Sequence, residues 1–260
     1  MSGCIGPDEG RCMTTEYPMH LQSALAHQAG RPRQLTLPGQ AATAEGPLDM
    51  TMMYVMHHAF RRDLRALSRA VAVTPLGDRV AWRALDRRWR LFAYVLHHHH
   101  TGEDEGYWPL LAGRVTGAER SVLADMEAEH HLIDPVLEQC ADLFLRLTFT
   151  RDKSARQSLV SALDRAQPLL EDHLAHEERE AIPLMQRHVT PAEDERIERE
   201  HFRAGVPLRR LFEVVPWVLH ELPPDARDRV LDLTGPAYRG MWLLTRGGFA
   251  RRDRRAMRHV

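Results

Sequence analysis

The sequence contains no apolar run close to the roughly 20 residues that a membrane-spanning helix needs. Its first twenty residues also lack the apolar core of a secretory signal peptide. Cysteine is scarce, with three in the chain and two of them, Cys4 and Cys12, in a polar N-terminal stretch, which is no basis for a disulfide framework. Positive charge is not in excess either, since 35 Lys and Arg oppose 36 Asp and Glu. We therefore expect a cytoplasmic protein that binds neither nucleic acid nor membranes.

The sequence also lacks the alternation of apolar and polar residues that marks β-strands, which predicts an all-α protein. Apolar residues recur instead at helical spacing in four long segments separated by short turns. Such an arrangement is typical of an up-down-up-down four-helix bundle. The four segments are residues 48–73, 78–115, 116–147 and 153–189.

Composition divides the chain into three parts. Residues 1–46 are rich in Gly, Pro and Gln and show no apolar period, so we expect a mobile N-terminal extension or a strap laid over the surface. Residues 47–190 carry the predicted bundle. Residues 191–260 are expected to form extra C-terminal helices that end in an arginine-rich, solvated tail.

The chain contains 16 histidines, which are concentrated in the four long segments. Residues three, four and seven positions apart share a helical face, so neighbours indicate which way a side chain points. His57 and His130 share their faces with apolar residues, whereas the adjacent His58 and His131 share theirs with charged residues. This pattern predicts that His57 and His130 point into the bundle. A single inward histidine is more often a hydrogen-bonded core residue, so neither position alone indicates a metal.

The second and fourth segments share the pattern H-x3-E-x5-P-L, which begins at His99 and at His173. A His and a Glu four residues apart lie on one helical face, so both can reach one metal ion in the bundle interior. The shared spacing selects His99 from the run of histidines at 97–100. Two unpaired carboxylates in one core would require cations. The sequence therefore predicts a metal site made of His57, His99, Glu103, His130, His173 and Glu177.

Four imidazoles and two carboxylates without a thiolate suit iron, with manganese as an alternative, and are too many donors for one tetrahedral zinc. Two six-coordinate ions sharing both carboxylates and an oxo or hydroxo bridge would keep two positions open. Those positions are available to water, O2, peroxide or another side chain.

The order His57, His99-x3-Glu103, His130, His173-x3-Glu177 resembles the hemerythrin-like (HHE cation-binding) domain family over about residues 47–190. The resemblance implies a non-heme diiron centre in a four-helix bundle, with those six residues as ligands. Residues 215–230 are similar to the C-terminal extension of actinobacterial members. The oxygen-carrying hemerythrins have H-x3-H in the third helix and H-x4-D in the fourth, and this chain departs from both patterns. These departures argue against reversible oxygen carriage.

Several further residues are candidates for supporting roles. Tyr54 and His201 are possible additional donors, although Tyr54 better fits a residue that supports the site and His201 a surface histidine. Cys140 shares the inward face of its helix and is expected in the core. Asp104 is the replacement candidate if Glu103 does not bind the metal.

Three functions follow from such a site. The first is binding of and reaction with O2 or related small oxidants, such as peroxide or nitric oxide, in a sensing or redox role. The second is a diiron oxidase or oxygenase acting on a small organic substrate, with the fifth helix and the region of Trp217 roofing a substrate cavity. The third is iron storage or buffering. The sequence shows no flavin, nicotinamide or iron–sulfur motif, which favours the first function.

Overall fold

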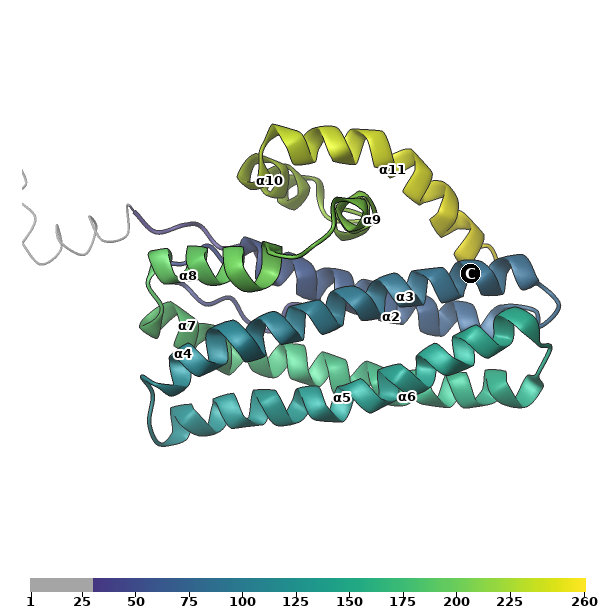
Figure 1. Ribbon diagram of the computed structural model, residues 1–260, viewed down its shortest axis with the longest axis horizontal. Coiled ribbons are helices and arrows are strands. Elements are labelled where there is room, and N and C mark those ends of the chain that lie inside the picture. Colours follow the sequence, from purple (N-terminus) through teal and green to yellow (C-terminus); the bar gives the residue numbers. More distant parts are fainter. Residues whose placement is uncertain (1–29) are drawn as a thin grey trace, which may run out of the picture. The chain divides into compact units, whose positions relative to one another are not determined.

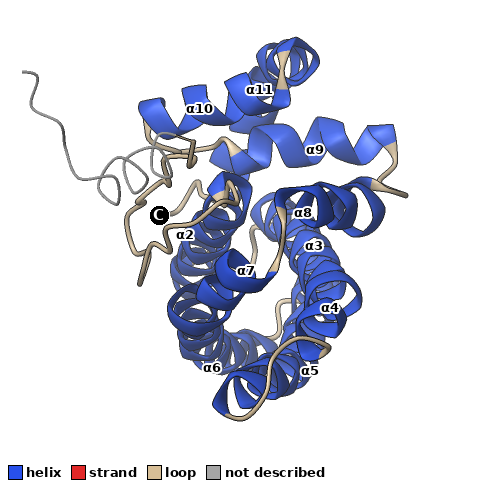
Figure 2. Cartoon of the chain, turned by 90° about the vertical axis from the view of Figure 1, so that its left-hand side faces the viewer, coloured by secondary structure: helices blue, strands red, loops and turns tan. Residues whose placement is uncertain are grey.

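The computed structural model describes residues 30–260, and its regular secondary structure is entirely helical, which confirms the expected fold class (Figure 1). Four long helices form a helical bundle: α2 Thr51–Val73, α3 Arg79–Gly102, α5 Ala118–Phe149 and α6 Lys153–His176. Helix α5 packs against α3 and α6, and α2 packs against α6 and α3. Viewed end-on, the four helices surround a common interior (Figure 2). No helix in the described part of the chain is long and apolar enough to cross a membrane.

Local sequence sets where these helices begin. Asp78 precedes α3 and its side chain accepts a hydrogen bond from the backbone of Ala81, and Asp152 caps α6 in the same way. One end of the bundle interior is aromatic, with Trp89 stacked on Phe144 at a centroid distance of 5.1 Å. Cys140 is fully buried in the same core, as expected, and burial raises the pKa of its thiol to about 12.

Helices α3 and α6 both change into a π-helical turn where the H-x3-E pattern reaches its glutamate. Segment η1 (Glu103–Tyr107) leads into α4 (Trp108–Ala112), and η2 (Glu177–Ala181) leads into α7 (Ile182–His188). Each short helix has a proline next to its first residue, and a proline cannot donate the backbone hydrogen bond that a continuous α-helix requires. The widened turns accommodate the prolines, and such turns are frequent at functional sites. The repeated sequence pattern thus corresponds to a repeated backbone geometry, a π-helical turn followed by a short helix.

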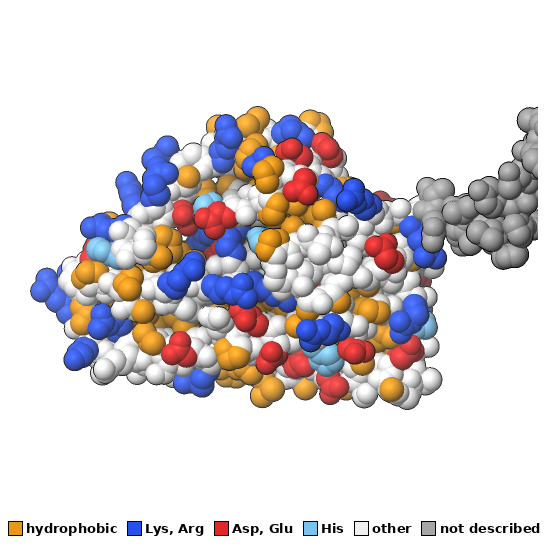
Figure 3. Space-filling view, turned by 180° about the vertical axis from the view of Figure 1, so that it is seen from behind, with side chains coloured by type: hydrophobic (Ala, Val, Ile, Leu, Met, Phe, Trp, Pro, Cys, Tyr) orange, Lys and Arg blue, Asp and Glu red, His pale blue; other side chains and the backbone are white. Residues whose placement is uncertain are grey.

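The C-terminal part consists of α8 (Pro191–Ile197), η3 (Glu198–Arg203), α9 (Leu208–Val218), α10 (Pro224–Thr234) and α11 (Pro236–Ala256). Helices α9, α10 and α11 lie on the side of the bundle formed by α2 and α3 (Figures 1 and 2). The arginine-rich end, expected as a solvated tail, is helical to Ala256 and buries Phe249. Acidic and basic side chains are interspersed over the face seen in Figure 3, in keeping with the near-zero net charge.

A buried carboxylate attaches α9 to the bundle. Asp63 on α2 is fully buried and accepts hydrogen bonds from Arg88 Nη2 at 2.9 Å and from Trp217 Nε1 at 2.7 Å. Burial alone would raise the pKa of Asp63, but the charges of Arg62 and Arg88 outweigh it and lower the pKa. The carboxylate therefore stays ionised and joins α2, α3 and α9.

The residues before α2 lie along the bundle surface. The Ala44 N–H donates to the Tyr54 hydroxyl at 2.9 Å, and the Leu48 N–H donates to Gln186 Oε1 at 3.0 Å. Residues 32–46 therefore form a strap, one of the two arrangements expected for the N-terminal extension. Residues 1–29 of that extension lie outside the described residues.

Two glycines let α8 and η3 pack closely on η1 and α3. A Cβ atom built on Gly102 would lie 2.7 Å from the ring of Phe202, and one on Gly106 would lie 2.7 Å from Ile197 Cγ2. Such distances are below normal contact, so a side chain at either position would displace its neighbour.

We expect Gly102→Ala to lower the free energy of unfolding of the metal-free protein by about 1–3 kcal/mol, because overpacking displaces Phe202. The control is Gly240→Ala, since nothing lies within 4 Å of a Cβ there. That change should stabilise α11 by up to about 1 kcal/mol through helix propensity. Urea unfolding followed by circular dichroism measures both effects. Equal shifts for the two variants would contradict the close packing of η3.

Candidate metal centre

The six residues predicted from the sequence come together in the bundle interior, and a seventh residue, His100, joins them. Four of the predicted side chains have donor atoms within 4.8 Å of one another, and the remaining two form a similar group with His100. All seven residues are buried. The two groups are His57, His99, Glu103 and Glu177, and His100, His130 and His173.

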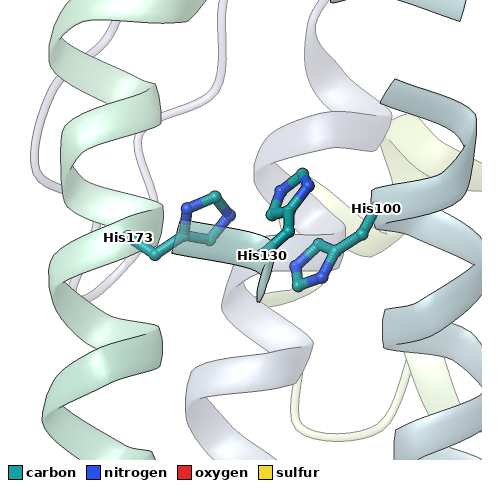
Figure 4. A group of neighbouring side chains, drawn as sticks. All are labelled: His100, His130 and His173. Carbon is teal, nitrogen blue, oxygen red and sulfur yellow. The ribbon is translucent and has the colours of Figure 1, made fainter. Parts of the chain in front are cut away.

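Figure 4 shows the second group, in which the imidazoles of His100, His130 and His173 converge from three different helices. The rings of His100 and His130 are nearly parallel, with centroids 3.9 Å apart. His173 approaches His130 edge-on at a centroid distance of 4.7 Å.

Sequence reasoning missed His100 because the H-x3-E spacing selected one histidine from the run. A signal was nevertheless present in the preceding turns. Buried apolar pairs recur every four residues along α3, at 91–92 and 95–96, and the next pair in the series is 99–100. A helical face this wide buries two adjacent residues per turn, so both His99 and His100 point inward.

Glu103 connects the two groups. Its Oε1 lies 3.1 Å from His99 Nε2 in the first group, and its Oε2 lies 3.6 Å from His130 Nε2 in the second. Glu177 Oε2 lies 3.1 Å from His57 Nε2. The carboxylate of Glu103 is therefore placed to contact two ions at once.

Despite these short distances, the facing atoms form no hydrogen bonds of normal geometry within the described part of the chain. Unpartnered buried atoms include the four carboxylate oxygens of Glu103 and Glu177 and the Nε2 atoms of all five histidines. Each buried polar atom without a partner costs about 1–3 kcal/mol. So many in one place are arranged to hold an ion, and nitrogen and oxygen donors without thiolate suit iron or manganese.

Acidic side chains outside the two groups hold three of the rings. Nδ1 of His57 pairs with Glu178 Oε1 at 3.0 Å, and Nδ1 of His173 pairs with Glu129 Oε2 at 2.8 Å. Asp104, the replacement candidate for Glu103, pairs instead with Nδ1 of His130 at 2.9 Å. These contacts leave Nε2 of each ring for a metal and fix the ring orientation.

Glu178 is itself held from two sides. Arg61 Nη1 donates to its Oε1 at 2.7 Å, and the backbone N–H of Ala41 donates to its Oε2 at 2.6 Å. The N-terminal strap therefore contributes to the position of His57.

Comparison with known proteins identifies the family of the chain. Residues 49–185, more than half of the chain, match the family described as the hemerythrin HHE cation binding domain. The chain belongs to this family. It is also similar to the zinc finger protein BRUTUS of Arabidopsis thaliana, with 26% identity over 169 residues that make up 65% of this chain and 13% of that protein. No solved structure matches the chain.

Two other predicted candidates lie outside both groups of the HHE domain. The Tyr54 hydroxyl accepts the hydrogen bond from the strap, and burial raises its pKa to about 12. His201 on η3 lies near Glu105, with Nδ1 3.8 Å from Oε2. His131 is exposed, as its charged neighbours predict.

Without an ion, the HHE domain has to distribute charge among its buried groups. Burial opposes protonation of His57, but the charge of Glu177 outweighs it and raises the His57 pKa to about 9. Burial likewise opposes ionisation of Glu177, but the charge of His57 outweighs it and lowers the Glu177 pKa to about 2. Burial and the charge of Glu177 raise the pKa of Glu103 well above its usual value, and burial lowers those of His99 and His100. The metal-free site thus holds one ion pair beside a protonated Glu103.

A cavity of about 460 Å³ reaches the first group from the C-terminal side. His99 forms part of its wall, as does Phe202, whose ring lies 6.1 Å from that of His99. Segments η3, α9 and α10 also contribute to the lining, and the first two belong to the predicted fifth helix. Trp217 is fully buried and anchors α9 on Asp63 instead of lining the cavity.

We expect His100→Ala to weaken binding of at least one metal ion by tenfold or more, because it removes a buried imidazole that converges with two others. The matched control is His97→Ala, since His97 is exposed on the same helix. Metal content by mass spectrometry and competition with a chelator measure the effect. The assignment of His100 would fail if His100→Ala bound metal like the wild type.

The metal-free protein should lose stability as pH rises above about 6.5, because below that pH the lowered pKa values of His99 and His100 act in the opposite direction. Its folded state holds a proton on Glu103 above the pH at which the unfolded chain releases it, so the unfolding free energy falls with pH in that window. His57 acts in the same direction, since the stability from its raised pKa is lost as pH rises from 6.5 through about 9.

The measurement is urea unfolding at pH 7 and pH 9 in the presence of a chelator. Glu103→Gln should lose less stability between these two pH values, because it removes one titrating group. Glu105→Gln is the control, since that side chain is exposed. An identical pH dependence for Glu103→Gln and wild type would contradict the pKa shift of Glu103.

Proposed function

We propose that the chain is a non-heme diiron protein that binds and reacts with O2 or related small oxidants, such as peroxide or nitric oxide, in a sensing or redox role. One iron would be held by His57 and His99, and the other by His100, His130 and His173. Glu103 and Glu177 would bridge them inside an up-down-up-down four-helix bundle. The observation that carries the proposal is the position of Glu103, whose two oxygens face the two donor groups. We also propose that the C-terminal helices are the extension of the actinobacterial type.

The seventh donor changes the number of open coordination positions. Five imidazoles, two bridging carboxylates and one bridging solvent ligand would fill all but one of the positions on two six-coordinate ions. The remaining position would belong to the ion held by two histidines, His57 and His99. His100 would thus take one of the two positions that the sequence left open, and the donor count would no longer argue against reversible oxygen binding.

The protein's own residues would prepare this position for a small molecule. Glu178 holds the His57 ring, and Phe202 lies over His99 and limits the access of water. When bound, iron would supply a redox-active centre to which a small oxidant can coordinate. Manganese fits the same donors, so metal identity has to be measured.

A second candidate function is a diiron oxidase or oxygenase acting on a small organic substrate. One observation favours it: the apolar cavity is walled by His99, on the side of the ion with the open position. Consumption of O2 that depends on an added organic compound would distinguish this function from the first.

The test is to load the protein with iron without oxygen, count the metal and record optical and Mössbauer spectra before and after exposure to O2. We expect close to two irons per chain and a spectroscopically coupled pair. His130→Ala should lose iron and His131→Ala should not. A single tightly held zinc under iron-replete expression would overturn the diiron proposal, and a count far above two would indicate iron storage.

The spectra after mixing with an oxidant test the second part of the proposal. A reversible adduct supports oxygen binding or sensing, and oxidation without an organic compound supports a redox role. A reduced diiron form that reacts with none of O2, peroxide and nitric oxide would overturn the oxidant role.

A further inference from the structure

The cavity beside the metal centre has the size of a binding site for an organic molecule. Its volume of about 460 Å³ is within the range of small-molecule pockets. Methionines of α2 form one wall, and valines and leucines of α9 and α10 form the opposite one. Methionine side chains adapt to irregular apolar ligands, and the aliphatic residues exclude charged ones. Most of the cavity therefore suits an apolar body.

The charged residues of the lining are concentrated on a few neighbouring elements. Three carboxylates contribute to the wall, from Asp49, Asp194 and Glu198, compared with one arginine, Arg203. Asp49 is paired with Arg229 outside the cavity lining, at 2.9 Å. The shortest distance between Glu198 and Arg203 is 3.9 Å, which is a weak ion pair. The lining therefore has an excess of negative charge.

Asp194 takes its hydrogen bond from a neutral group. The Tyr107 hydroxyl donates to Asp194 Oδ1 at 2.7 Å, and this places the carboxylate at the cavity wall without neutralising it. Burial raises the pKa of Glu198 to about 7, with a further contribution from the charge of Asp194. Burial also raises the pKa of Asp194, against the hydrogen bond from Tyr107. Both carboxylates would be stabilised in their ionised form by a cation within the cavity.

Phe202 relates the acidic residues to the metal centre. Its ring lies 5.8 Å from that of Tyr107 and 6.1 Å from that of His99. Tyr107 and His99 are eight residues apart on continuous helical segments, a separation of roughly 12 Å along the axis. A molecule whose charged end contacts Asp194 can therefore extend over Phe202 toward His99.

We infer that the cavity binds an apolar organic amine, with its ammonium group against Asp194 and Glu198 and its apolar body along Met53, Met56 and Val95 toward His99. Binding itself requires no metal. The placement of the body beside an iron rests on the proposed function and would define the substrate class of the oxidase alternative.

Three probes of equal chain length test the charge of the head group: n-decylamine, 1-decanol and decanoate, each used below the concentration at which it aggregates. Isothermal titration calorimetry with iron-loaded protein at pH 7.5 measures their affinities. We expect one decylamine per chain, bound at least about tenfold more tightly than decanoate, with decanol in between. Equal affinities for the three probes, or no binding of any, would overturn the inference.

Substitutions of the acids locate the head group. The double variant Asp194→Asn with Glu198→Gln should weaken decylamine binding by about tenfold or more and change decanol binding little. The control is Glu195→Gln, which removes an exposed charge from the same helix and should have no effect. Loss of binding in the control but not in the double variant would place the amine on the surface and overturn the inference.

A substitution that fills the cavity locates the apolar body. Val214→Trp should abolish binding of decylamine and decanol, whereas Val80→Trp on the exposed face of α3 should not. Circular dichroism and thermal melting establish that both variants fold. Met56→Trp fills the cavity from the opposite wall and replaces Val214→Trp if that variant unfolds. Unchanged binding in a folded, filled variant would overturn the inference.

Repeating the titration on metal-free protein separates this inference from the proposed function. Decylamine binding by a chain that fails to hold two irons would leave the amine site standing and overturn the diiron proposal. A chain that holds two irons but does not bind decylamine would support the diiron proposal and overturn the amine site. A shift of the iron spectrum on adding decylamine supports placement beside His99, and an unchanged spectrum in saturated protein would contradict it.

Discussion

The burial of two carboxylates, those of Glu103 and Glu177, inside an otherwise apolar bundle is the constraint on which the rest of the structure depends. Neither side chain has any exposed surface, and their oxygens have no hydrogen-bond partners among the described residues. Charges so deeply buried have to be compensated by cations or lost by protonation. The five imidazoles converge in two groups that could hold metal cations. Without metal, His57 compensates one carboxylate and a proton neutralises the other.

Compensation of the buried carboxylate charges by a metal ion depends on residues that are distant in sequence. The imidazoles bind a cation only if Nε2 faces inward. Asp104, Glu129 and Glu178 impose this orientation on three of the five rings from outside. Glu178 in turn depends on Arg61 and on the strap at Ala41. Ala41, which is 137 positions from Glu178 along the chain, thus contributes through Glu178 to the position of His57. Affinity for metal and stability of the fold are therefore coupled.

The C-terminal helices cover one side of the metal centre and form a cavity beside it. Their attachment through Trp217 and Asp63 holds α9 over α2, and the glycines at 102 and 106 let η3 and α8 approach α3 and η1 closely. Phe202 then covers His99, and an apolar cavity with an acidic wall remains beside it. The same segments thus bury His99 and form a cavity of the size of an organic molecule.

The sequence by itself determined the helical class, the inward direction of His57 and His130, and the pairing of His99 with Glu103. These features follow from helical periodicity, which is a local property. His173 and Glu177, which share the same spacing, lie in different donor groups. Tertiary structure decided the inclusion of His100, because a face wide enough to bury two adjacent residues exists only when helices pack on both sides of α3. It also decided that Asp104 orients His130, that residues 32–46 form a strap and that the arginine-rich end is a packed helix. Each depends on contacts between residues far apart in the sequence, and no local pattern specifies them.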